Sequence, residues 1–218
     1  MKLYFAVSIV VLGIAHANDS NFKCSRKPDN IPEFNEEMRE SFVDTHDIYR
    51  LTFAQENQAS KMRKMVYDCA TEQSAYDAAV QSCETTTFTY RKYLKNDENF
   101  YVIDYIEDVA DVVSHVGDSW WSEKSRIDGK KPINVYRSSY NISNFANMAW
   151  DKHAKLGCAV VKCHTEKVHV VCHYGPKVKE DGKEIYSEGE PCDDCNDYQK
   201  EGVVTCDEDA LCVVAQKP

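Results

Sequence analysis

Two short apolar runs near the middle of the chain constrain the fold more than any other feature. The first run is LGCAVVKC at residues 156–163, and the second is VHVVCHY at residues 168–174. Only the four residues HTEK separate them. Two β-rich runs joined by a short polar linker predict a β-hairpin, and cysteines in both runs can clamp one strand to the other.

The N-terminus has the pattern of a secretory signal peptide. A short basic start, Met1-Lys2, precedes an apolar run from Leu3 to Ile14 and an A-x-A sequence at residues 15–17. That run is shorter than a membrane span requires. We therefore expect residues 1–17 to be removed, and the mature chain to be secreted without membrane insertion.

The cysteine content agrees with an extracellular protein. All ten cysteines follow the predicted signal peptide, and an even number in an oxidising compartment predicts five disulfides. Cys192-x-x-Cys195 also has zinc-ligand spacing, but secretion favours disulfides there. The balance of 26 basic and 36 acidic residues gives a net charge of −10, which disfavours nucleic acid and anionic membranes as partners.

Helical periodicity predicts three helices before or beside the hairpin. The first begins after Pro32, with Phe34, Met38, Phe42 and Ile48/Tyr49 near helical spacing. The second runs from about Ser60 to Cys83, and the third from about Tyr105 to Ser122. Residues 84–100 are expected to form a long loop, and the composition shift after Gly175 indicates a linker.

Four motifs together resemble the CAP superfamily of secreted proteins: FANMAW at 145–150, LGCAVVKC, VVCHY at 170–174 and IYSEGEPCDDC at 185–195. The longer phrase ISNFANMAWD is closer to a hookworm subgroup of that superfamily. The resemblance covers residues 34–212 and implies an α+β fold, a three-layer α/β/α sandwich with a small disulfide-tied C-terminal hinge. The chain would then divide into an N-terminal arm at 18–33, a CAP domain at 34–175, and a linker and cysteine-rich hinge at 176–218.

The same resemblance implies a disulfide pattern that spacing alone does not fix. The implied pairs are Cys24–Cys69, Cys83–Cys163, Cys158–Cys172, Cys192–Cys206 and Cys195–Cys212. The pair across the hairpin also suits antiparallel geometry, provided that the register places the two cysteines opposite each other.

Members of the superfamily often have a pocket of two histidines and two glutamates that can hold a divalent metal. Here Glu98 and Glu123 match the glutamates, but the first histidine is missing where the chain reads Glu84-Thr85-Thr86-Thr87, and Asn144 replaces the second. Because an amide is a poor zinc ligand, we predict no tightly bound zinc and no cofactor. His169 and His173 share one strand face, where a packing role is favoured. No nucleophile motif is present, so the chain is predicted not to be an enzyme.

Function is therefore expected to lie in a binding surface. Resemblance to the hookworm subgroup implies a secreted antagonist of host integrins. Platelet receptors are the favoured target, and their antagonism would inhibit aggregation and adhesion. The alternatives are antagonism of the leukocyte β2 integrin and an extracellular lipid- or sterol-binding role. Integrin ligands commonly offer a carboxylate to a divalent cation. Asp128, in the predicted Asp128-Gly129 turn, is the preferred contact residue, and Asp97 is the second candidate.

Two glycosylation sequons occur, at Asn18-Asp19-Ser20 and Asn141-Ile142-Ser143. The first would lie at the mature N-terminus. We expect glycosylation at Asn141, in an exposed segment before the hairpin.

Overall fold

The computed structural model describes residues 24–25, 27–32, 34–84, 96–104, 111–207 and 210–216. The predictions for the signal peptide, the Asn18 sequon and Thr85–Thr87 concern residues outside these ranges. Among the described residues, no helix has both the length and the apolar character that crossing a membrane requires.

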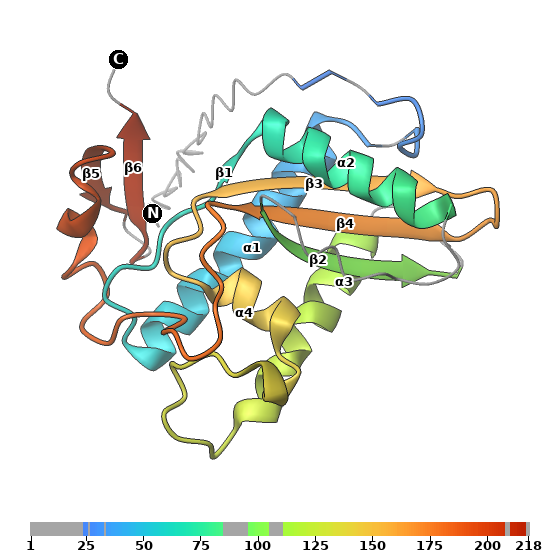
Figure 1. The fold of residues 1–218 in the computed structure, drawn as a ribbon. Helices are drawn as coiled ribbons and strands as arrows, with labels where there is room; N and C mark the ends of the chain where they lie inside the picture. The colour runs from blue at the N-terminus through green and yellow to red at the C-terminus, as the bar shows by residue number, and fades with distance from the viewer. Residues whose placement is uncertain are drawn as a thin grey trace, which may run out of the picture.

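A four-stranded sheet forms the centre of the molecule (Figure 1). Its strands lie in the order β1 (Val66–Tyr67), β3 (Lys155–Lys162), β4 (Val168–Gly175) and β2 (Asp97–Ile103). The β3–β4 pair is the predicted hairpin, and its register places Cys158 directly opposite Cys172. The β1 strand pairs with β3 in parallel, and β2 pairs with β4 antiparallel.

Helices cover both faces of this sheet (Figure 1). Because strand side chains alternate between faces, Ala159, Val161 and Val171 pack against α2 (Cys69–Glu84). The alternate residues, including Val160 and Val170, pack on the opposite face in a larger core with helices α1, α3 and α4. These helices span Glu36–Asn57, Asp111–Trp121 and Ser143–Ala149. The predicted α/β/α sandwich is confirmed.

The first predicted helix is α1, whose Asn35 side chain accepts a hydrogen bond from the Met38 amide at its N-terminus. Of the alternatives Ile48 and Tyr49, Ile48 is 62% exposed and Tyr49 packs against the core. The second helix begins at Cys69 rather than Ser60. Residues 66–68 are extended along β3 instead, and the Asp68 carboxylate then accepts the Thr71 amide where α2 starts.

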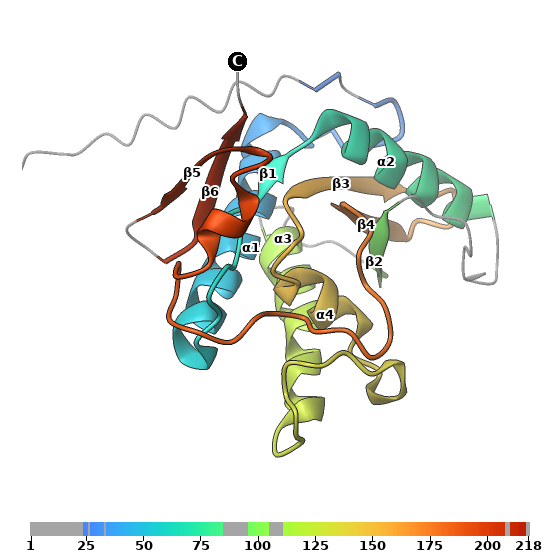
Figure 2. The same cartoon turned by 60° about the vertical axis from the view of Figure 1, so that its left-hand side comes forward.

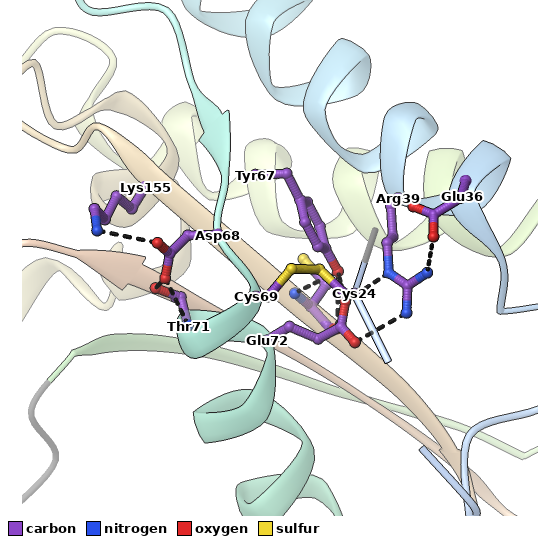
Figure 3. Close-up of a disulfide and its surroundings, with 10 residues drawn as sticks. Cys24, Glu36, Arg39, Tyr67, Asp68, Cys69, Thr71, Glu72 and Lys155 are labelled. Carbon is purple, nitrogen blue, oxygen red and sulfur yellow. Dashed lines mark hydrogen bonds and ion pairs between the residues drawn. A yellow bond between two sulfur atoms is a disulfide. The ribbon is translucent and has the colours of Figure 1, made fainter. Parts of the chain in front are cut away.

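The N-terminal end of α2 lies directly on β3, at a point where only glycine fits. A Cβ at Gly157 would lie 2.1 Å from the Glu72 backbone nitrogen. This close approach brings Glu72 to a buried ion pair with Arg39 of α1, with Nε–Oε2 at 2.6 Å, while the Tyr67 hydroxyl donates to the same carboxylate (Figure 3). The cluster joins helices from both faces around the β1 edge.

The outer edge of β3 is covered along most of its length. Near one end it pairs with β1, and further along, the Ile31 amide donates to the Val160 carbonyl while the Asn30 side chain accepts the Val160 amide. A disulfide between Cys24 and Cys69 ties the segment before Asn30 to the start of α2 (Figure 3).

The C-terminal region is a small two-stranded sheet of β5 (Gly202–Cys206) and β6 (Cys212–Gln216). Cys192–Cys206 and Cys195–Cys212 link it to the preceding segment, and Cys212 exchanges backbone hydrogen bonds with Met62 and Lys64. Cys83–Cys163 and Cys158–Cys172 lie in the body of the protein. The five pairs are those implied by the resemblance, and each of the ten cysteines is in a disulfide.

Candidate functional site

Glu98, the first of the two glutamates matched to the superfamily pocket, faces α2. It lies opposite His173 in the β2–β4 register, and its Oε2 is 2.8 Å from His173 Nε2. The other ring nitrogen of His173 is 2.7 Å from the Ser74 hydroxyl of α2. The neighbours Asp97 and Asn99 make their contacts on the opposite face of the strand, as strand alternation requires.

The contacts therefore run from a serine to a histidine to a carboxylate (Ser74, His173 and Glu98), as in the catalytic triad of hydrolases. The arrangement differs from an active site in its location, because His173 has 0% exposed surface and lies between α2 and the sheet. The Ser74 hydroxyl is half-buried and meets the imidazole across this interface. The contact is best understood as buried polar packing between helix and sheet.

Glu123, the second matched glutamate, is in the 3₁₀ segment η1 (Ser122–Ile127) and binds the start of α4. Its carboxylate accepts hydrogen bonds from the Asn144 amide at 2.8 Å, the Asn144 side chain at 3.0 Å and the Phe145 amide at 3.1 Å. Asn144 thus holds the Glu123 carboxylate through both its amide and its side chain. Both matched glutamates therefore have protein partners.

Asp97 was expected to be a mobile acid on a loop, and this prediction is wrong. Asp97 is the first residue of β2 and is only 5% exposed. Its Oδ2 accepts hydrogen bonds from the Val178 and Lys179 amides at 2.9 and 3.0 Å and lies 3.1 Å from His153 Nε2. Burial acts to raise the pKa of Asp97, but the contacts with His153 and with these amides hold it below its usual value.

Lys179 is a charged residue of this pocket that the sequence analysis did not identify. Its ammonium donates to the Ser143 hydroxyl at 2.6 Å and approaches the Ser143 carbonyl at 3.4 Å. The Tyr136 ring centroid is 5.8 Å from Nζ. Burial lowers the pKa of Lys179 to about 8, although the carboxylates of Asp97 and Glu123 act in the opposite direction. Nothing in its local sequence, GPKVKEDGK, distinguishes this lysine from its neighbours.

A buried polar network continues from the pocket into the protein. Asn99 donates to the Tyr174 hydroxyl at 2.9 Å, and that hydroxyl lies 2.8 Å from His46 Nε2. The other nitrogen of His46 is 2.7 Å from the Phe42 carbonyl. Burial lowers the pKa of His46 to about 4, against the raising effect of this carbonyl, so the imidazole is neutral at pH 7. These contacts make His46 a packed, hydrogen-bonded residue of the interior.

Asp128 is exposed, in contrast to the buried residues of the pocket. It follows η1 in a turn, and Gly129 has a φ of +76°, a conformation that glycine adopts without strain. The aspartate is exposed, and its carboxylate has no hydrogen-bond or ion-pair partner among the described residues. Asn141 is also exposed and follows the short 3₁₀ segment η2 (Ser138–Tyr140).

Comparison with known proteins identifies the class. The model of the CAP cysteine-rich secretory protein family matches residues 43–174, and this chain belongs to that family. It is 41% identical to Hookworm platelet inhibitor 1 from Ancylostoma caninum over 216 residues, covering 98% of this chain and 99% of that protein.

Solved structures give the same fold. A crystal structure of the hookworm platelet inhibitor has a TM-score of 0.73 and 39% identity, covering 89% of this chain and 98% of that one. A crystal structure of NaASP2 with Zn²⁺ has a TM-score of 0.68 and 26% identity, covering 87% of this chain and 100% of that one. The present residues fit zinc poorly, because both matched glutamates have protein partners and an asparagine replaces a ligand.

Proposed function

We propose that this chain is a secreted, non-enzymatic protein that binds an integrin on host platelets and thereby inhibits platelet adhesion and aggregation. The observation that carries the proposal is the near full-length identity of 41% to a protein named as a platelet inhibitor. Five disulfides support the extracellular location, because such bonds persist in oxidising compartments.

The arrangement of polar groups supports binding rather than catalysis. His173 and Glu98 are engaged within a helix–sheet interface, and Glu123 is engaged by the start of α4. These groups are occupied in holding the fold together. A partner would instead be bound at exposed groups.

Asp128 is the contact residue we propose for the integrin. Its carboxylate is exposed in a turn without a protein partner, so it can approach a cation held by the receptor. Carboxylate oxygen is the ligand that hard divalent cations prefer. The segment after α3 that carries this turn lies at a different end of the molecule from the hinge in both views (Figures 1 and 2).

The test is direct binding of the oxidised protein to immobilised integrins with Mg²⁺ or with EDTA. The panel contains the platelet fibrinogen receptor, the platelet collagen receptor and the leukocyte β2 receptor. We expect saturable, cation-dependent binding to a platelet receptor. Binding to the β2 receptor alone would reassign the target cell, and binding to none would overturn the proposal and direct attention to lipid extraction.

We also propose that Asn141 carries a glycan. The residue is exposed, and its sequon continues into the first turn of α4. Protein secreted from a eukaryotic host should lose mass on enzymatic deglycosylation, and the Asn141→Gln variant should not. An unchanged mass for the unmodified sequence would contradict this assignment.

A further inference from the structure

The chain contains two Asp-Gly pairs, and the fold holds them differently. Asp128-Gly129 follows η1, and Asp181-Gly182 lies in the segment after β4. We propose that Asp128-Gly129 is a site of spontaneous isomerisation to isoaspartate, and that the contacts of Asp181-Gly182 protect the second pair. The isomerisation is a reaction of the chain itself and does not depend on the integrin target.

The reaction joins an aspartate carboxyl group to the backbone amide of the next residue. The amide nitrogen attacks Cγ, a C–N bond forms, and the carboxyl hydroxyl leaves with the amide hydrogen as water. A second water molecule then opens the resulting succinimide ring. Opening at Cγ returns aspartate, whereas opening at the backbone carbonyl leaves the main chain running through Cβ and Cγ, which is isoaspartate. Glycine favours the attack because it has no side chain beside the nitrogen.

Both reacting groups are accessible in the first pair. The Asp128 carboxylate is exposed, and neither it nor the Gly129 amide has a hydrogen-bond partner in the part of the chain that the structure describes. Asp128 has φ −57° and ψ 127° and Gly129 has φ +76°, the conformation of a type II turn, in which the Lys130 amide donates to the Ile127 carbonyl. A Cβ at Gly129 would meet nothing within 4 Å. The Asp128–Gly129 peptide therefore has room for the rotation that ring closure requires.

In the second pair the fold engages both groups. Asp181 Oδ1 accepts the Ser138 amide at 2.6 Å, and Oδ2 lies 3.8 Å from the Arg137 guanidinium. Hydrogen bonds from Ser138, with a smaller effect of the Arg137 charge, hold the pKa of Asp181 below its usual value, which disfavours the protonated carboxyl that loses water. The attacking nitrogen is engaged as well, because the Gly182 amide donates to the Tyr136 carbonyl at 2.9 Å.

The two sites therefore share a dipeptide and differ in tertiary contacts. Ring closure at Asp181 has to break a charge-assisted hydrogen bond and a backbone hydrogen bond, so we expect it to be about tenfold slower than at Asp128. Isomerisation keeps the negative charge of the turn but adds a methylene group to the main chain, which moves the carboxylate. If Asp128 is the integrin contact proposed above, this movement would weaken that contact.

The experiment incubates the folded, oxidised protein at neutral pH and body temperature in water enriched in heavy oxygen. Each ring opening adds a labelled oxygen, and peptide mapping by mass spectrometry assigns it to Asp128 or Asp181. An isoaspartyl methyltransferase with labelled methyl donor then detects the isomerised residue. We expect label and isoaspartate at Asp128, at about ten times the rate for Asp181. Equal rates at the two sites, or no label at either, would overturn the proposal. Neither readout involves an integrin.

Two controls separate the effect of the fold from that of the dipeptide. In the reduced chain unfolded in denaturant, the contacts of Asp181 are lost, so the two sites should react at similar rates. Gly129→Ala places a methyl group beside the attacking nitrogen and should slow labelling at Asp128 about tenfold, with Asp181 unchanged. A difference between the sites that persisted in the unfolded chain would show that the folded contacts do not cause it and would refute the protective role. Undiminished labelling of Gly129→Ala would refute attack by the following amide.

Discussion

The pocket beside α4 and the turn that ends η1 both contain acidic side chains, yet they use them in opposite ways. In the pocket, Asp97 accepts two backbone amides and contacts His153, and Glu123 accepts three N–H groups. In the turn, Asp128 is exposed, and its carboxylate has no partner among the residues described. The same functional group thus organises the chain in one region and is available to a partner in the other.

This difference shows that the location of a carboxylate, more than its presence, decides its function. A buried carboxylate needs hydrogen-bond donors to offset lost hydration, and those donors then use its lone pairs. An exposed carboxylate keeps its lone pairs for an ion or a receptor. Four substitutions can break or sharpen this contrast.

The largest effect is expected for Asp97→Ala. The substitution leaves the Val178 and Lys179 amides and the His153 ring without their acceptor in a buried position. We expect a loss of about 3–5 kcal/mol in unfolding free energy, measured by denaturant unfolding at pH 7. Asp128→Ala, the exposed counterpart, should change stability by less than about 0.5 kcal/mol. Equal stability of the two variants would show that the buried carboxylate contributes no more to stability than the exposed one.

Protonation of His46 should lower the unfolding free energy, because the imidazole is buried in its neutral form. The folded-state pKa is about 4, below the ordinary value of 6.5, so the unfolded chain gains a proton first as pH falls. The stability associated with this residue is full above pH 6.5 and is lost between 6.5 and 4, by about 3 kcal/mol. The pH dependence of wild-type stability minus that of His46→Gln isolates this loss. A pH-independent difference would show that the interior admits the proton freely.

A smaller loss is expected for Glu123→Gln. The amide keeps one acceptor oxygen for the start of α4, but it loses the charge and the second acceptor that Asn144 and Phe145 use. We expect a loss of about 1–2 kcal/mol by denaturant unfolding. Glu180→Gln serves as the control, because Glu180 is exposed beside the pocket lysine. A loss no larger than that of the control would mean that Glu123 does not hold α4.

Asp128→Ala should affect binding with little effect on stability. We expect affinity for the platelet integrin to fall about tenfold, equivalent to about 1.4 kcal/mol. Asp193→Ala removes an exposed aspartate of the hinge and should leave the affinity unchanged. Surface-immobilised receptor with Mg²⁺ provides the measurement. Equal affinities for the two variants would exclude Asp128 as the contact residue.

Much of the fold could be predicted because it depends on local pattern. The hairpin followed from two β-rich runs, and α1 followed from its apolar spacing. The predicted start of the second helix, Ser60, lies nine residues before the observed start, Cys69. Met62 and Met65 fit helical spacing, but they are buried by contacts outside any helix. The β2 strand was missed, since polar residues such as Asp97 and Asn99 are buried there by tertiary hydrogen bonds.

The site was less predictable for a related reason. The replacement of a histidine by Asn144 could be read from the sequence, but its contact with Glu123 could not. Asp97 lies in a charged stretch that is typical of a loop, and only the fold brings Val178 and His153 to it. Lys179 becomes distinctive through Ser143, which is 36 residues away in sequence.

The covered edge of β3 has a consequence for solubility. An unpaired strand edge is a template for further strands, and through it soluble proteins add to one another and aggregate. Here β1 and the segment at Asn30–Ile31 occupy that edge, and a single bridge, Cys24–Cys69, ties the segment to α2. Reduction of this one bond would remove the covalent tie that holds the segment beside β3. The tied segment therefore leaves less of the β3 edge open to pairing with a strand of another molecule.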